Sequence, residues 1–255
     1  MTEADKLRFE ICIRENLLSD RSDGENIGTY KEKRLHRVLK KFCEPDEACH
    51  EIPIGAYVAD ILRGNDIIEI QTGSFYPMKA KIRYYLEETD FSVTIVRPLP
   101  HIKWCVWLDP ESGEALSRKK SPKKTLPKDV MRDWLFLCDF LGNERLTVKF
   151  LLLEEKEYRL LNGWSKDKKR GSKRYERIPI GLIDEVIYCG AEDYRAFLPE
   201  ELGESFTASE FMKAAKLRSY GGYASLKILC HLGFIEKSEE RKGRSFVYKR
   251  KGLSR

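Results

Sequence analysis

The sequence predicts a mixed α/β protein of the α+β kind, on two observations. Residues 51–71 alternate apolar and polar side chains and are broken at Gly55 and at the turn tripeptide 63–65, a pattern typical of three short strands. Apolar residues recur at helical spacing on both sides of this segment, over about residues 29–42 and 78–89. The predicted order is therefore helix, three strands, helix.

Further elements are expected along the rest of the chain. The helices predicted from helical spacing lie at residues 5–18 and 128–141. The predicted strands lie at residues 91–97, 102–108 and 146–154, and a strand or short helix is expected within residues 175–188. Pro98 and Pro100 are expected to end the first of these strands, because proline donates no backbone hydrogen bond. The continuous apolar run at 102–108 favours a buried strand.

The last fifty residues predict a compact helical unit with a hairpin. Thr207 and Glu210 form a capping box, flanked by the apolar pair Phe206 and Phe211. A helix follows, then a turn at residues 219–222. The remaining predicted elements are a second helix at 223–232 and two short strands at 234–237 and 245–249.

Two carboxylates on the predicted strands need a physical explanation. Asp60 and Glu69 each lie within an apolar strand, where a carboxylate is costly unless it is paired or binds a cation. Neighbouring antiparallel strands bring both to one edge, and hard oxygen ligands grouped in this way suit Mg²⁺ or Mn²⁺. Glu32 supplies a third acid from the apolar stripe of the preceding helix. The alternative is that both strand acids face solvent on a half-exposed sheet.

This order of elements, with Asp60 and the triplet Glu69-Ile70-Gln71, resembles the PD-(D/E)XK (restriction-endonuclease-like) nuclease superfamily in a Glu-x-Gln variant. The resemblance covers about residues 28–108 and implies an αβββαβ core. It implies that Asp60, Glu69 and the carbonyl of Ile70 bind the metal and that the last motif residue orients water. That residue is usually lysine, and Gln71 replaces it here. The accessory residues implied are the acids Glu32 and Glu51 and the helix lysines Lys79 and Lys81.

The C-terminal order of helix, turn, helix and hairpin resembles a winged helix-turn-helix, which places its second helix against DNA and its wing on the backbone. The same fold also serves protein contacts, and that alternative stays open. Basic segments elsewhere suit phosphate contacts or a solvated loop. The residues predicted to contact nucleic acid are Lys119, Lys120, Lys123, Lys169, Arg170, Tyr223, Lys227, Arg241, Lys242 and Arg244.

Three units follow from these patterns: a nuclease-like domain at 1–145, an intervening α+β segment with a basic loop at 146–202, and a winged helix at 203–255. The net charge of +6 is mildly basic, and the seven scattered cysteines contain no Cys-x-x-Cys pair. We expect a cytoplasmic protein with reduced cysteines and no signal peptide or membrane span. A homodimer is compatible with the sequence.

The sequence thus favours a Mg²⁺-dependent DNA nuclease. One alternative is a DNA-binding regulator that keeps the fold without the chemistry, which the replacement of lysine by Gln71 favours. Another is an enzyme that acts on RNA, although no stacking motif supports it. No nucleotide cofactor is expected, because the chain contains no P-loop.

Overall fold

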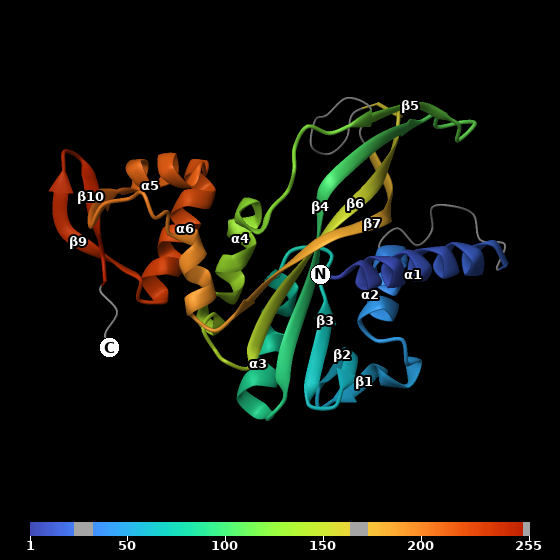
Figure 1. The fold of residues 1–255 in the computed structure, drawn as a ribbon, viewed down its shortest axis with the longest axis horizontal. Coiled ribbons are helices and arrows are strands. Elements are labelled where there is room, and N and C mark those ends of the chain that lie inside the picture. The colour runs from blue at the N-terminus through green and yellow to red at the C-terminus, as the bar shows by residue number, and fades with distance from the viewer. Residues whose placement is uncertain (23–32, 164–172, 252–255) are drawn as a thin grey trace.

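The computed structural model describes residues 1–22, 33–163 and 173–251, and its frame is a mixed sheet of seven strands (Figure 1). The strand order is β1-β2-β3-β4-β6-β7, with β5 paired to the C-terminal part of β4. The pairs β3–β4 and β4–β6 are parallel, and the other pairs are antiparallel. The strands are β1 (His50–Ile54), β2 (Tyr57–Arg63), β3 (Asp66–Ile70), β4 (Ser92–Leu108), β5 (Ala115–Lys120), β6 (Leu146–Leu160) and β7 (Lys173–Cys189). The mixed sheet confirms the predicted α/β class.

Helices cover both faces of this sheet. On one face, α1 (Glu3–Ser22) and α2 (Lys33–Cys43) pack against Ile68 and Ile70 of β3. On the other face, α3 (Lys79–Glu88) packs against Ile67 and the neighbouring strands. Successive residues of a strand point to opposite faces, so β3 contributes to both cores and is buried along most of its length. Among the described residues, no helix combines the length and apolarity that a membrane crossing would need.

Strand β4 corrects the expectation that two prolines end a strand near residue 97. Residues 92–108 form one strand that pairs with β6 along its length, with a register shift between Pro100 and Ile102. The carbonyl of Val96 accepts a hydrogen bond from Gln71 of the chain that follows β3, and Pro98 and Pro100 have the same parity as Val96. The backbone nitrogens of both prolines therefore point to the edge of β4 beyond the end of β3. No strand there needs the N–H group that proline lacks.

Two other segments also differ from the expectation. The basic run at 116–128 begins as the exposed strand β5 and not as a loop, because it pairs with β4. The helix expected at 128–141 is divided into a short α4 (Met131–Trp134) between 3-10 turns η3 (Pro127–Val130) and η4 (Leu135–Phe140). Strand β6 extends beyond residue 154, and residues 173–189 form the strand β7 that pairs with it. Both strands belong to the same sheet as β4, across the domain boundary predicted at residue 145.

The C-terminal region forms a small helical unit with its own sheet, ordered β8-β10-β9. The capping box is confirmed: the Thr207 side chain accepts from the backbone N–H of Glu210, and the Glu210 carboxylate accepts from that of Thr207. The second helix begins at Ser219, so the turn predicted at 219–222 is its first turn, and Lys216 takes the left-handed backbone position. The elements are η5 (Glu192–Phe197), β8 (Ser205–Thr207), α5 (Ala208–Ala215), α6 (Ser219–His231), β9 (Ile235–Lys242) and β10 (Ser245–Arg250).

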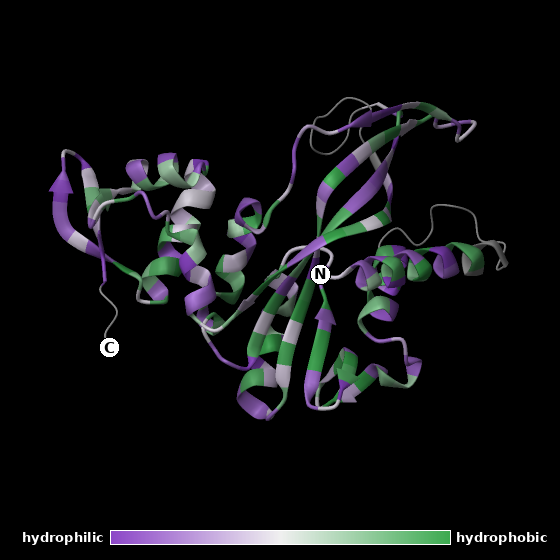
Figure 2. Cartoon of the chain, in the orientation of Figure 1, coloured by the Kyte–Doolittle hydropathy of each residue, from purple (hydrophilic) through white to green (hydrophobic). Residues whose placement is uncertain are grey.

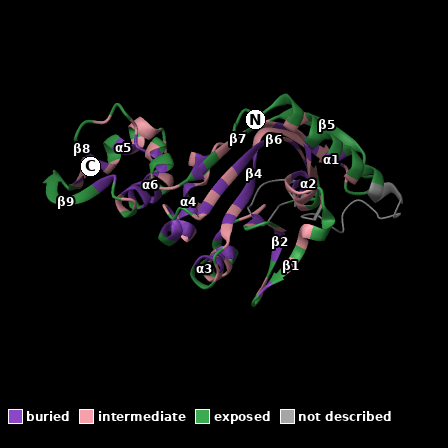
Figure 3. Cartoon of the chain, turned by 60° about the horizontal axis from the view of Figure 1, so that its bottom comes forward, coloured by how far each residue is buried: buried purple, intermediate pink, exposed green. Residues whose placement is uncertain are grey.

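This C-terminal unit shares an apolar core with the sheet. Figure 3 shows buried residues running from β4 through α4 into α6, whereas α1, β5 and β9 are mostly exposed. Strand β9 is also largely hydrophilic in Figure 2. Trp134 of α4 is fully buried at the centre, with its ring 5.1 Å from those of Phe150 and Tyr188 and 5.6 Å from that of Phe197. α4 therefore fixes the position of the C-terminal unit beside the sheet.

We expect Trp134→Ala to lower the free energy of unfolding by about 3–5 kcal/mol, because it empties a large buried volume surrounded by rings. Urea titration followed by circular dichroism measures this loss. Leu116→Ala is the matched control, since Leu116 is 54% exposed on β5 and should change stability by less than about 0.5 kcal/mol. Equal effects of the two variants would contradict the central role of Trp134.

Candidate active site at the end of strands β2 and β3

The candidate site lies where the pairing of β2 with β3 stops. The ladder runs from Arg63 and Asp66 to Ile61 and Ile68, and the next residues in register are Asp60 and Glu69. Asp60 does not continue the backbone ladder. Its Oδ2 instead accepts a hydrogen bond from the backbone N–H of Ile70 at 2.8 Å. The sheet thus holds the two carboxylates on adjacent strands, as predicted from the apolar strand pattern.

Asp60 is an ionised carboxylate held by several donors. The Nε2 atom of His36, on α2, lies 3.2 Å from Oδ2. Burial raises the pKa of Asp60 and is the largest single influence, but the bonds from His36 and Ile70 and the charge of Lys81 together outweigh it. The pKa of Asp60 therefore lies below its usual value.

Glu69 is the buried partner, with 3% of its surface exposed. Lys81 of α3 places its Nζ 2.6 Å from Oε2, and the hydroxyl of Tyr85 lies 3.3 Å from Oε1. Burial and then the negative charge of Asp60 raise the pKa of Glu69 to about 7, although Lys81 acts in the opposite direction. Two carboxylates in neighbouring positions thus have pKa values displaced in opposite directions.

The Gln71 side chain is engaged by its own loop. Its Nε2 donates to the carbonyl of Ser74 at 2.8 Å, and its Oε1 accepts from the backbone N–H of Gly73 at 3.4 Å. Ser74 donates in turn to Asp133 of α4 at 3.0 Å, and the buried Arg97 of β4 donates to the same carboxylate at 2.6 Å. The loop after β3 is therefore fastened to α4.

Of the other predicted site residues that the structure describes, only Lys81 contacts a carboxylate of the candidate site. Lys81 contacts Glu69, but Lys79 pairs with Asp139 at 2.8 Å and does not reach the carboxylates. Glu51 lies beside Asp60 in the order of the sheet, between the paired residues His50 and Ile52, yet it is exposed and its carboxylate pairs with Lys40. Glu32 lies outside the described residues. Within the described ranges, no group of three or more His, Cys, Asp or Glu side chains gathers to hold a metal ion.

Two residues of the site were not assigned roles from the sequence. His36 lies on α2 between the buried Leu35 and Leu39, which is a visible but weak signal for an inward polar group. Tyr85 is fully buried on α3 and was predicted as part of an apolar stripe. A tyrosine in such a stripe carries a hydroxyl that needs a partner, and here the partner is Glu69.

The residues predicted to contact nucleic acid are mostly exposed. Lys119 and Lys120 lie on β5, where Lys120 and Arg118 rest over the ring of Trp104, and Lys123 follows this strand. Tyr223 and Lys227 lie on the exposed side of α6. On the hairpin of β9 and β10, Arg241 lies over Phe246, Lys242 pairs with Glu210 at 2.8 Å, and Arg244 is exposed. Lys169 and Arg170 lie outside the described residues.

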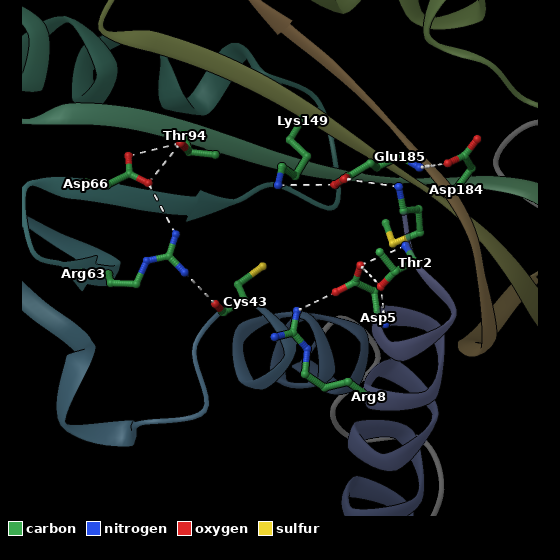
Figure 4. A network of polar contacts seen from close by, with 11 residues as sticks. Thr2, Asp5, Arg8, Cys43, Arg63, Asp66, Thr94, Lys149, Asp184 and Glu185 are labelled. Atoms are coloured by element: carbon green, nitrogen blue, oxygen red, sulfur yellow. Dashed lines mark hydrogen bonds and ion pairs between the residues drawn. The ribbon is translucent and has the colours of Figure 1, made fainter.

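A second polar cluster lies on the α1 side of the sheet and lines a cavity of about 300 Å³ (Figure 4). Arg63 lies 3.9 Å from Asp66, which accepts from Thr94 at 3.1 Å, and Lys149 lies 3.3 Å from Glu185. The cations and carboxylates named here balance one another. The lining also includes Asp5, which lies 3.4 Å from Arg8, and Met1, whose ammonium group lies 3.9 Å from Glu185.

The pKa of Glu69 predicts a pH dependence of stability. A carboxyl whose folded pKa of about 7 exceeds its usual 4.5 binds protons more tightly when folded, so stability falls as pH rises between these values. The maximal slope is about 1.4 kcal/mol per pH unit. The lowered pKa of Asp60 acts only below its usual 3.8, outside this window.

Urea unfolding of the wild type and of Glu69→Gln at several pH values between 4.5 and 8, without divalent metal, measures this slope. We expect the wild type to lose stability relative to the variant as pH rises. A constant difference across the window would contradict the burial of an ionisable carboxyl at this position.

Comparisons with known proteins give a family but no activity. A curated uncharacterized protein of Treponema pallidum (strain Nichols) is 25% identical over 152 residues, which is 59% of this chain. The match spans 57% of the length of that relative. No solved structure matches the chain. The model of the domain of unknown function DUF8091 matches residues 33–189, which include β1 to β7, α3 and both carboxylates. The chain therefore belongs to the DUF8091 family.

Proposed function

We propose that this chain is a metal-dependent nuclease that hydrolyses phosphodiester bonds of DNA. The observation that carries the proposal is the pair Asp60 and Glu69 on adjacent strands, with Lys81 bonded to the buried member of the pair. Burying Glu69 beside a second carboxylate is unfavourable for the protein without metal. Carboxyl groups with strongly displaced pKa values are found more often at functional sites than elsewhere. The order α2, β1 to β3, α3 and β4 also supports the proposal, because it is the αβββαβ order expected from the resemblance to the nuclease superfamily.

The donor set fits Mg²⁺ or Mn²⁺. The carboxylates of Asp60 and Glu69 and the carbonyl of Ile70 are hard oxygen ligands, and Mg²⁺ is usually held by one or two carboxylates together with waters. A divalent cation would also relieve the repulsion that raises the pKa of Glu69. When bound, such an ion supplies an activated water and stabilises developing negative charge on the phosphate.

Lys81 is a better candidate than Gln71 for the role that lysine fills in the resembled superfamily. Both groups of the Gln71 amide are engaged by the backbone of its own loop, at Gly73 and Ser74. Lys81 already approaches Glu69 from the helix that follows. We assign to Lys81 the orientation of water and to Gln71 the support of the loop.

The second candidate function is a DNA-binding protein without nuclease activity. Gln71 favours it, because an amide held by its loop is not free to orient water. Within the part of the chain that the structure describes, no three His, Cys, Asp or Glu side chains gather to hold a metal ion, which favours it too. In that case Lys81 would serve only to neutralise Glu69, and the chain would act through its basic surfaces.

We expect Asp60→Asn and Glu69→Gln to lower Mg²⁺-dependent nicking of supercoiled plasmid by on the order of a hundredfold or more, because each removes a charged metal ligand. Both replacements are isosteric and should keep the fold. Binding of Mn²⁺, measured by calorimetry, should weaken in parallel. Undiminished nicking by Asp60→Asn would contradict the catalytic assignment.

The two lysines of α3 give a matched pair for the same assay. We expect Lys81→Ala to lose most of the nicking activity and Lys79→Ala to retain it, since Lys79 contacts Asp139 and not the carboxylates. Equal activity of the two variants would remove Lys81 from the site. Metal binding without nicking in every protein tested, wild type included, would favour the second candidate function.

The hairpin of the C-terminal unit gives a prediction about affinity. Replacing Arg241, Lys242 and Arg244 together by Ala should weaken binding of all DNA sequences about equally. The salt dependence should fall by roughly one unit of log–log slope for each phosphate that the hairpin no longer neutralises. Fluorescence anisotropy over a salt series measures both quantities. An unchanged slope would indicate that the hairpin does not bind phosphates and would favour a protein-binding role for the C-terminal unit.

A further inference from the structure

Exposed rings form a continuous path from the loop of the candidate site to the C-terminal unit. Tyr76 follows the loop that holds Gln71, and its ring lies 5.2 Å from that of Phe136 in η4. Arg132 precedes Phe136 by four residues across the junction of α4 and η4, and its guanidinium lies 5.0 Å from the ring of Tyr220 on α6. The path thus consists of two side-chain contacts joined by this short stretch of chain.

The path continues along α6. Tyr220, Tyr223 and Lys227 are spaced by three and four residues and therefore lie on one side of the helix. That side is exposed, whereas Ala224, Leu226 and Ile228 of the same helix are buried. We call the six residues from Tyr76 to Lys227 on this path the aromatic track: Tyr76, Phe136, Arg132, Tyr220, Tyr223 and Lys227.

The exposure of the track is unusual for rings of this size. Tyr76 is 67% exposed, Tyr220 is 61% exposed and Tyr223 is 56% exposed. Single exposed apolar residues need no explanation, but a connected series of exposed rings marks an interaction surface. The cations Arg132 and Lys227 each follow a pair of rings along the track. The acids of the α4 and η4 segment are already engaged, Asp133 by Arg97 and Asp139 by Lys79.

We propose that the aromatic track binds an unpaired segment of nucleic acid, with bases stacked on the tyrosine rings and phosphates on Arg132 and Lys227. This inference rests on the proposed function and specifies its substrate. Flat rings with cations between them are the chemistry that single strands require, since every base offers a face for stacking and every nucleotide carries a phosphate. Tyr76 lies at the end of the loop that begins with Gln71, so the track ends at the loop that follows the strand of Glu69.

The position of α6 favours a single strand over a duplex. Helix α6 lies between α5 and α4 (Figure 1), and its buried residues belong to the core shared with both. A helix that reads a duplex must project into the major groove. Here α4 stands beside α6, and Arg132 of α4 covers one side of the Tyr220 ring. The exposed tyrosines are thus part of a surface shared by two helices.

The test is fluorescence anisotropy of the full chain in EDTA, which prevents cleavage, with a labelled 20-nucleotide single strand and the duplex of the same sequence. We expect tighter binding of the single strand. Tyr220→Ala and Tyr223→Ala should each weaken that binding by on the order of tenfold and leave duplex binding within about twofold. Phe replacements at the same positions keep the ring and should bind the single strand within about twofold of the wild type.

Ile187→Ala serves as the control for an exposed apolar residue away from the track, at 43% exposure on β7. Melting temperatures of all variants confirm that they are folded. Equal losses for single strand and duplex, or no loss in the Ala variants, would overturn the inference. Self-association that depends on Tyr220 and Tyr223, with strand binding unaffected, would overturn it in favour of a protein partner.

The outcome is separable from that of the hydrolysis proposal. Ring-dependent binding of single strands, without Mg²⁺-dependent cleavage of either the single strand or the plasmid, would support the track and overturn only the nuclease activity. Mg²⁺-dependent nicking that needs Asp60, together with strand binding indifferent to the tyrosines, would overturn only the track.

Discussion

The burial of the Glu69 carboxylate is the constraint on which the candidate site depends. A carboxyl group at this depth must either be protonated or lie beside a positive charge. Lys81 and Tyr85 of α3 both contact it. These two residues are one turn apart on α3, so the same pair fixes which side of the helix faces the sheet. The chemistry of one strand residue thus sets the orientation of the helix that follows.

The long pairing of β4 with β6 provides the frame around this site. Strand β3 ends at Ile70, whereas β4 continues to Leu108. Beyond Val96 the edge of β4 is therefore no longer paired with β3, and we call this edge the step; the loop after β3 begins there. Prolines at 98 and 100 suit the step, where no strand requires their N–H groups. The step gives the Gln71 loop access to Asp133 and so connects the sheet to α4.

The short strands β1 to β3, the helix α3 and the C-terminal capping box were predictable because local signals govern them: period-two alternation, glycine turns and cap residues. The continuity of β4 through its two prolines could not be predicted, because it depends on which strand lies beside each proline. The adjacency of Asp60 and Glu69 followed from the strand order, whereas the separation of Lys81 from Lys79 depends on the rotation of α3. The basic strand β5 was missed because its pairing partner, and not its composition, makes it a strand.

Charge balance gives a physical reason for glutamine at position 71. Glu69 and Gln71 are two residues apart on the chain, and Lys81 already pairs with Glu69. Arg177 donates to the carbonyl of Thr72. Burial is the main cause that lowers the pKa of Arg97, and the charge of Arg177 acts in the same direction. A lysine at 71 would add another cation to this group, close to arginines that already repel one another. A neutral amide that satisfies the loop backbone avoids this repulsion, and Lys81 of α3 supplies the positive charge at Glu69.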